Sequence, residues 1–296
     1  MKVETSVRDA CAADTAAGIR IHHRRVEGDL GDCVRALVAV EIDATQALPL
    51  SIAPHDSLML TVQFGRDARE PDAKAALGGN TCLTGIRHWT GSFVGAGNCV
   101  SLFALLTPLG AVRLLESRAL QQAPRILAPV AALLDVQLTR SLEDRVATAQ
   151  GIDGKLDALG AWLEARATAR RVHDRAALRA GRAALHLCRE PRVTIEQVAE
   201  AQHVSRRQLE RDFERWIGVS PRHLSQVARV QQVSRRVHAG AGLADAAAEL
   251  GFADQPHMTH VVKQLTGLTP RRFVASQRTP IAAAFRSATR GGTVYL

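Results

Sequence analysis

The C-terminal third of the chain contains the same short pattern twice, 49 residues apart. The stretch Gly218-Val219-Ser220-Pro221-Arg222 recurs as Gly267-Leu268-Thr269-Pro270-Arg271. At the same offset upstream, Leu209 corresponds to Met258, Phe213 to Val262, Ala199 to Ala248 and Glu200 to Glu249. A repeat of this length indicates one supersecondary unit that is built twice.

In each unit the pattern predicts a short helix, a tight turn and a second helix. Thr194 and Gln197 have the spacing of a capping box at the start of the first helix, and Ser205 and Gln208 repeat that spacing for the next helix. The apolar residues of this next helix recur at i, i+4, i+7 and i+8, namely Leu209, Phe213, Trp216 and Ile217. One face is therefore expected to be buried and the other polar, which is typical of a helix-turn-helix that enters the major groove of DNA.

The second unit follows the same plan with different side chains. Gly251 is suited to a left-handed turn, Phe252 is expected to fill the corner, and Asp254 is the predicted N-cap of the second helix. Its inward-facing residues are predicted to be Met258, Val261, Val262 and Leu265. Between the units, Pro221 is expected to start one stiff helix that ends near Gly240 and holds the two reading helices at a fixed separation. If they enter successive major grooves on one face of the duplex, that separation is about 34 Å, one turn.

The polar faces of the two reading helices supply the candidate DNA contacts. Arg and Gln can bond guanine and adenine edges, and Glu can accept from cytosine. We predict DNA contacts from Ser205, Arg206, Arg207, Gln208, Glu210, Arg211, Arg215, Gln255, His257, Thr259, His260, Lys263 and Arg271.

Charge is divided unevenly along the chain. Residues 1–165 contain 16 Lys and Arg against 19 Asp and Glu, whereas residues 166–296 contain 22 against 10. Almost every basic residue of 166–296 is Arg, whose guanidinium can donate two parallel hydrogen bonds to one phosphate. The excess positive charge thus lies with the repeats, as expected for a surface that neutralises phosphates.

Composition predicts a globular protein with more than one domain. The chain has 296 residues, of which 46% are apolar, and no run approaches the roughly 18 apolar residues of a membrane span. Residues 1–20 lack an apolar signal-peptide core, so we expect a cytoplasmic protein with no membrane partner. The five cysteines are an odd number without C-x-x-C spacing, which favours buried thiols over a disulfide framework or a zinc site and leaves a redox sensor as the alternative.

The predicted fold class is α+β, with five segments. Residues 1–18 are expected to be frayed, 19–110 to form a β-rich sensing or dimerisation domain, 111–175 a helical connector, 176–276 the double helix-turn-helix, and 277–296 a flexible tail. Apolar runs at 34–42, 57–64 and 99–106 predict strands of an antiparallel barrel or sandwich, and 66–80 an exposed loop.

Residues 176–276 resemble the DNA-binding domain of AraC/XylS-type transcriptional regulators. The most specific motifs are Ser205-Arg206-Arg207-Gln208-Leu209-Glu210-Arg211-Asp212-Phe213, Leu250-Gly251-Phe252-Ala253-Asp254-Gln255 and the two Gly-x-(Ser/Thr)-Pro turns. The resemblance implies two helix-turn-helix units that read an asymmetric site, behind an N-terminal sensing or dimerising domain. The N-terminal half, with residues 103–111, is similar to the cupin-like domain of that family.

The second unit departs from the family pattern. The family often has Arg, then Phe two residues later, then Lys, where this chain has His260, Val262 and Lys263. We therefore expect the first unit to supply more of the sequence discrimination and the second more of the backbone anchoring.

Two constellations in the N-terminal half point to small ligands. His22, His23, His55 and His88 suggest a cupin metal site, but the adjacent pair would face opposite sides of a strand, so we predict neither a metal site nor a cofactor. Trp89, with Arg87 and His88 as polar anchors, is either a core aromatic or the lid of a ligand pocket.

The leading interpretation is a sequence-specific regulator of transcription that binds double-stranded DNA and is not an enzyme. Its other partners would be a small-molecule effector, a second subunit, and RNA polymerase if it activates. Two alternatives stay open: a β-barrel enzyme tethered to a DNA-binding module, and a constitutive DNA-binding protein whose N-terminal half only dimerises.

Overall fold

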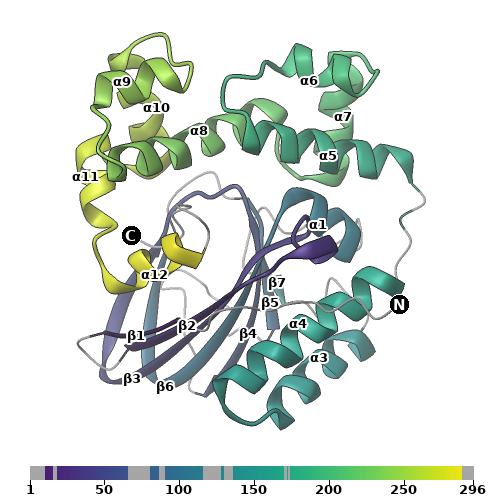
Figure 1. Ribbon diagram of the computed structural model, residues 1–296, viewed down its shortest axis with the longest axis vertical. Coiled ribbons are helices and arrows are strands. Elements are labelled where there is room, and N and C mark those ends of the chain that lie inside the picture. The colour runs from purple at the N-terminus through teal and green to yellow at the C-terminus, as the bar shows by residue number, and fades with distance from the viewer. Residues whose placement is uncertain are drawn as a thin grey trace.

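The computed structural model describes residues 11–15, 19–65, 81–86, 91–115, 128–129, 136–169, 172 and 174–288. In this part of the chain, seven strands form one antiparallel sheet in the order β1-β2-β3-β6-β4-β5-β7. The strands are β1 Cys11–Thr15, β2 Ile19–Arg25, β3 Val34–Ile52, β4 Leu58–Gly65, β5 Thr81–Thr84, β6 Gly91–Leu106 and β7 Ala128–Pro129. A 3-10 turn at Gly28–Leu30 joins β2 to β3. The predicted N-terminal antiparallel β region followed by a helical C-terminal domain is confirmed (Figure 1).

The central strands β3 and β6 are apolar on both faces. Leu37 and Ala39 lie in one hydrophobic cluster, whereas their neighbours Val38 and Val40 lie in another. Successive side chains of a strand point to opposite faces, so both faces of the sheet are covered. This explains why the strands appear in the sequence as nearly continuous apolar runs.

Three helices cover the first face of the sheet. They are α1 Pro108–Leu114, α3 Val136–Thr148 and α4 Gly151–Ala169 (Figure 1). Helix α1 starts at the N-cap Thr107, whose hydroxyl accepts a hydrogen bond from the Gly110 N–H at 2.9 Å. Buried side chains of α3 and α4, including Leu142 and Trp162, join the cluster of this face.

The opposite face of the sheet is covered by a helix from the end of the chain. Instead of the expected flexible tail over 277–296, residues Pro280–Ala288 form helix α12. Its Ile281, Ala282 and Phe285 share one side and are buried, and the Phe285 ring meets that of Phe103 edge to face at 5.6 Å. The apolar face of β2, β3 and β6 provides the burial that orders this segment.

The start of the chain also differs from the expectation of a frayed segment over 1–18. Cys11–Thr15 pair with Ile19–His23 as strand β1. Pairing needs only backbone N–H and C=O groups, so an Ala-rich, weakly apolar segment can join a sheet edge.

The remaining helices form a layer above the sheet in the view of Figure 1. They are α5 Arg175–Arg189, α6 Ile195–Ala201, α7 Arg206–Trp216, α8 Pro221–His238, α9 Leu243–Glu249, α10 Gln255–Thr266 and α11 Pro270–Ser276. Helix α8 crosses the layer, with α6 and α7 at one end and α9, α10 and α11 at the other (Figure 1). No helix in the described part of the chain is long and apolar enough to span a membrane.

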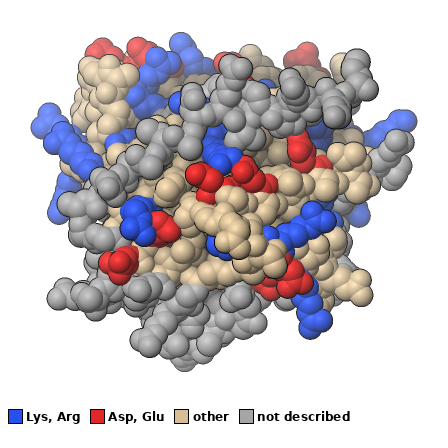
Figure 2. Space-filling view, turned by 60° about the horizontal axis from the view of Figure 1, so that its bottom comes forward, with Lys and Arg blue, Asp and Glu red and all other residues tan. Residues whose placement is uncertain are grey.

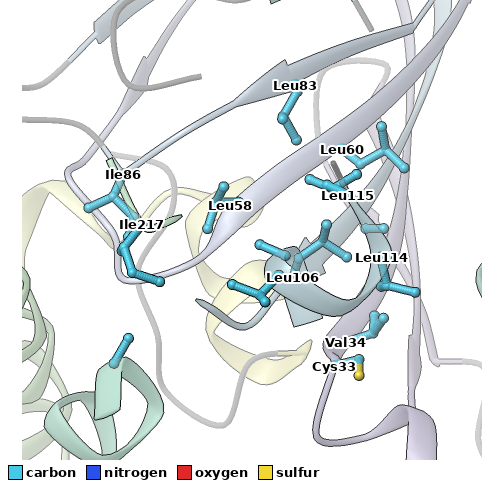
Figure 3. Close-up of a cluster of buried hydrophobic side chains, with 14 of the residues drawn as sticks. Cys33, Val34, Leu58, Leu60, Leu83, Ile86, Leu106, Leu114, Leu115 and Ile217 are labelled. Atoms are coloured by element: carbon cyan, nitrogen blue, oxygen red, sulfur yellow. The ribbon is translucent and has the colours of Figure 1, made fainter. Parts of the chain in front are cut away.

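The core of the first helix-turn-helix unit is continuous with the core of the sheet. Ile217, after α7, belongs to the same cluster as Leu58 of β4 and Ile86, which follows β5, and Figure 3 shows these side chains gathered together. Helix α5 lies so close to α1 that a Cβ on Gly181 would be 3.1 Å from the Leu109 Cα. A side chain at position 181 would therefore push the two helices apart.

The second unit has its own core and a narrower connection to the sheet. Its cluster contains Ala53, from the segment after β3, together with α8 and α10 residues. Nearby, the buried Gln231 side chain of α8 donates to the Pro54 carbonyl at 2.7 Å. Both units are thus attached to the N-terminal domain.

Candidate nucleic-acid interface

The first unit begins with the predicted capping box, which is confirmed. The Thr194 N–H donates to Gln197 Oε1 at 2.9 Å, and the Gln197 N–H donates to Thr194 Oγ1 at 3.2 Å. Between α6 and α7, His203 adopts a left-handed conformation with φ of 54°. Ser205 then caps α7 by accepting from the Gln208 N–H at 3.2 Å, so the reading helix starts at Arg206.

The second unit is built from different residues with the same functions. Gly251 takes the left-handed turn with φ of 72°, and the Asp254 carboxylate accepts from the His257 N–H at 2.6 Å to cap α10. The repeated Gly218 and Gly267, which follow α7 and α10, also have positive φ, 82° and 73°. The repeated glycine therefore permits the turn that ends each reading helix.

The structure corrects the repeat register upstream of the turns. The N–H of Val204 bonds the Ala199 carbonyl at 3.0 Å, and the N–H of Phe252 bonds the Ala247 carbonyl at 3.0 Å. Ala199 is thus equivalent to Ala247, not to Ala248, which is exposed. The second unit holds one more residue between corner and N-cap, so the offset is 48 before the turn and 49 after it. Glu200 is by the same reasoning equivalent to Ala248 and not to Glu249.

The predicted DNA-contacting residues lie on the two reading helices and at their ends. On the α7 side, the structure exposes Ser205, Arg206, Arg207, Arg211 and Arg215, and half-buries Gln208 and Glu210. On the α10 side it exposes Gln255, His257, His260 and Lys263, half-buries Thr259, and exposes Arg271 in the first turn of α11. The arginines are not inside the protein, and their contact with DNA stays a prediction.

Arg206 is held by two carboxylates in the free protein. Its guanidinium lies 2.9 Å from Glu210 Oε1 and 2.5 Å from Glu196 Oε1. Arg206 and Glu196 are exposed and Glu210 is half-buried, and ion pairs in contact with water are weak. A DNA phosphate can therefore replace the carboxylates at small cost.

Asp212 is a site residue that the sequence analysis missed. It is buried on the inner side of α7, where Arg179 of α5 contacts it at 2.6 Å. Its other oxygen accepts from Gln208 Nε2 at 2.7 Å, and Gln208 Oε1 in turn accepts from Arg211. Asp212 thereby connects the packing of α7 to the orientation of two side chains on its outer face. An Asp inside the apolar stripe between Leu209 and Phe213 was the available signal.

A buried ion pair lies between the sheet and the helical layer. The two terminal nitrogens of Arg35 on β3 each lie 2.9 Å from one carboxylate oxygen of Asp56. Burial raises the pKa of the Asp56 carboxyl, but the guanidinium groups of Arg35 and of Arg235 on α8 outweigh it and hold that pKa below its ordinary value. Burial also raises the pKa of the neighbouring Cys188 thiol on α5. The predicted burial of thiols is confirmed for Cys33, Cys82, Cys99 and Cys188.

The structure describes only some of the candidate ligand-binding residues of the N-terminal domain. Arg87, His88 and Trp89 lie outside the described residues, as does the loop 66–80. His55 is buried. Burial, and then the charge of Arg25, lower the pKa of His23. Within the described ranges, no three His, Cys, Asp or Glu side chains are grouped to hold a metal ion.

The face of the molecule opposite the helical layer is mixed in charge. Figure 2 brings the lower end of the sheet forward, and on this face Asp and Glu lie among Lys and Arg. Arg24 of β2, for example, bonds both Asp153 and Asp157 of α4. The unbalanced basic charge instead belongs to residues 166–296, which include both reading helices.

Comparison with known families identifies the C-terminal region. A family model described as a helix-turn-helix domain matches residues 198–276, which include both units with their reading helices. Residues 198–276 thus match a helix-turn-helix model of the AraC type. No curated protein sequence matches the chain.

Solved structures of AraC-family regulators are similar to the AraC-type domain or to most of the chain. The C-terminal domain of AraT, a response regulator from Geobacillus stearothermophilus, is 22% identical and covers 36% of this chain and 90% of its own, with a TM-score of 0.32. An AraC-type regulator from Chromobacterium violaceum is 22% identical over 34% of this chain and 94% of its own, with a TM-score of 0.32. ToxT from Vibrio cholerae is 11% identical over 81% of this chain and 97% of its own, with a TM-score of 0.43.

Proposed function

We propose that this protein is a sequence-specific DNA-binding regulator of transcription, controlled through its N-terminal domain. The observation that carries the proposal is the pair of capped reading helices, α7 and α10, which present Arg, Gln, His and Lys side chains to solvent from the two ends of α8. Such polar helices enter the major groove, and a rigid link fixes the distance between their half-sites.

The two units would divide the work of recognition. In α7, Arg211 is held by Gln208, which Asp212 orients, so a planar guanidinium is placed for a bidentate contact with guanine. In α10, the side chains of His260 and Lys263 are exposed and make no hydrogen bond within the described part of the chain. The first unit would therefore discriminate bases, and the second would chiefly bind the backbone.

The test is a selection of bound duplexes from a random library, followed by footprinting at several salt concentrations. We expect one asymmetric site with two protected major grooves about 10 base pairs apart and an affinity that falls steeply with salt. The proposal fails if the purified protein shows no preference for any duplex sequence.

Control through the N-terminal domain is supported by the way the domains are joined. The first unit shares its core with the sheet, and α8 bonds the segment after β3. A small-molecule effector or a second subunit that shifts the sheet would therefore act on the spacing of the reading helices. RNA polymerase would be a further partner if the protein activates transcription. The protein would act in the cytoplasm and would catalyse no reaction. Binding measured with and without candidate metabolites, and as a function of protein concentration, tests this control.

A further inference from the structure

A basic cleft lies between the two helix-turn-helix units. It has a volume of about 360 Å³ and is bordered by the segment before α6, the start of α7, the first turns of α8 and the turn after α9. Its charged lining consists of Arg192, Arg206, Arg222, Arg229 and Glu196. Only Arg206 among these residues belongs to the predicted DNA contacts.

Three of the cleft arginines have no acidic partner among the residues that the structure describes. Glu196 is bonded to Arg206, and no carboxylate of the described residues lies within ion-pair distance of Arg192, Arg222 or Arg229. Arg222 and Arg229 lie two helical turns apart on α8, on the side that faces the cleft. The cleft therefore concentrates positive charge that no described carboxylate neutralises.

Arg229 is fixed in place at the floor of this cleft. Its guanidinium lies 5.1 Å from the centre of the Phe252 ring and donates to the Gly251 carbonyl at 3.3 Å. Its Nε is buried and has no hydrogen-bond partner within the described part of the chain. Burial, and then the charge of Arg222, lower the pKa of Arg229. A half-buried cation beside a second cation is stabilised when an anion binds between them.

We propose that this cleft is a phosphodiester site that holds the DNA backbone between the two major grooves. The inference rests on the proposed function and adds a contact in the middle of the site. Arg206 at the start of α7 borders the cleft on one side, and Gly251, three residues before the N-cap of α10, borders it on the other. A duplex read by both helices on one face must carry backbone past this place, because backbone separates successive major grooves.

The first experiment compares two single-charge variants of α8. Arg222→Gln removes an exposed guanidinium from the cleft, whereas Arg236→Gln, the matched control, removes one that pairs with Glu249 at 3.2 Å away from the cleft. We expect Arg222→Gln to weaken specific and random duplexes alike, by roughly 3-fold to 10-fold, and to reduce the slope of log K against log salt by about 0.9. Equal effects of the two variants would overturn the proposal.

The second experiment locates the phosphate. Single phosphates of the selected site are replaced by neutral methylphosphonates, one at a time. We expect methylphosphonate at one position midway between the two protected grooves to weaken binding by the wild type. The same replacement should leave binding by Arg222→Gln nearly unchanged, because this variant has already lost the contact between Arg222 and that phosphate. If every central position affects both proteins equally, the cleft does not hold the backbone.

Two further outcomes separate this inference from others. A wild-type protein that binds no preferred duplex refutes the proposed function and the cleft site together, whereas a normal two-groove footprint without a central phosphate effect refutes only the cleft. Titration of the DNA-free protein with inorganic phosphate is the last arm. Tight binding that Arg222→Gln abolishes, with unchanged DNA affinity, would assign the cleft to a free phosphate ligand and overturn the proposal. Arg192→Gln provides an independent variant, since Arg192 is also exposed.

Discussion

At the scale of single residues, the proposed recognition depends on a buried group that does not face the DNA. Asp212 accepts from Arg179 on α5 and from Gln208 on α7, so one buried carboxylate serves both packing and side-chain orientation. Hydrogen bonds to a charged group in a partly buried place are stronger than those in water. Asp212 is therefore a positioning residue of the reading helix.

The first prediction concerns this carboxylate. Asp212→Asn should reduce the free energy of unfolding by about 1.5 to 3 kcal/mol, because the bond to the charged Arg179 is weakened. It should also narrow the ratio of specific to random DNA affinity, since Gln208 and Arg211 lose their orientation. Urea unfolding and competition binding measure the two effects. Glu214→Gln, an exposed neighbour on α7, is the control and should change neither.

The second prediction compares the two reading helices. Arg211→Ala should cost on the order of 1 to 3 kcal/mol of binding and relax the base preference, whereas Lys263→Ala should weaken all sequences alike. Binding to a panel of single-base variants of the site distinguishes these patterns. Equal loss of discrimination in both mutants contradicts the division of labour between the units.

At the scale of elements, local signals predicted the helix-turn-helix units well. The capping residues Thr194 and Asp254 and the turn glycine Gly251 act within a few residues of themselves, so their spacing in the sequence is sufficient to assign them. The strand runs at 34–42 and 99–106 were found for the same reason.

The features that the sequence did not predict depend on distant partners. Helix α12 is ordered by a sheet face whose strands lie from about 180 residues (Phe103) to about 260 residues (Ile21) earlier in the chain, and nothing within its own sequence identifies that face. The extra residue in the second turn was hidden because both sides of the turn still matched at one offset. The pairing of Asp56 was not predicted either, since its partner Arg35 lies 21 residues earlier, on β3.

The third prediction tests the role of α12. Phe285→Ala removes a fully buried ring that contacts Phe103, so the free energy of unfolding should fall by about 3 to 5 kcal/mol. Thermal or urea unfolding measures this loss. Ser287→Ala, an exposed change on the same helix, should have little effect. A wild-type-like stability of Phe285→Ala would show that α12 does not hold the sheet.

At the scale of the whole molecule, the sheet and the helical layer meet through both apolar and charged contacts. The apolar part is the shared core around Ile217, and the charged part is the Arg35–Asp56 pair near Arg235 of α8. A buried ion pair adds little net stability, but removal of one member leaves an uncompensated charge. The pair is therefore a sensitive point of the interface between the layers.

The fourth prediction follows from the lowered pKa of Asp56. Arg35→Ala should destabilise the protein by about 3 to 5 kcal/mol at neutral pH. Because the carboxyl pKa is lower in the folded protein than in the unfolded chain, its stabilising contribution is present above the unfolded value of about 3.9 and is lost as pH falls through the folded value. Unfolding measured from pH 7 to pH 3 should show a smaller acid loss for Asp56→Asn than for the wild type. Identical acid profiles would contradict the assigned pairing.

Because α5 packs closely against α1 at Gly181, the helix-turn-helix domain cannot simply be separated from the N-terminal domain. A fragment expressed from Asp174 onwards would expose to water the side chains that now meet Leu109, Leu58 and Ile86. Such a fragment should aggregate in solution unless Ile217 and its neighbours are replaced by hydrophilic residues. Fusing the helix-turn-helix domain to another sensor domain will require redesign of the apolar surface that it now buries, as well as of the linker.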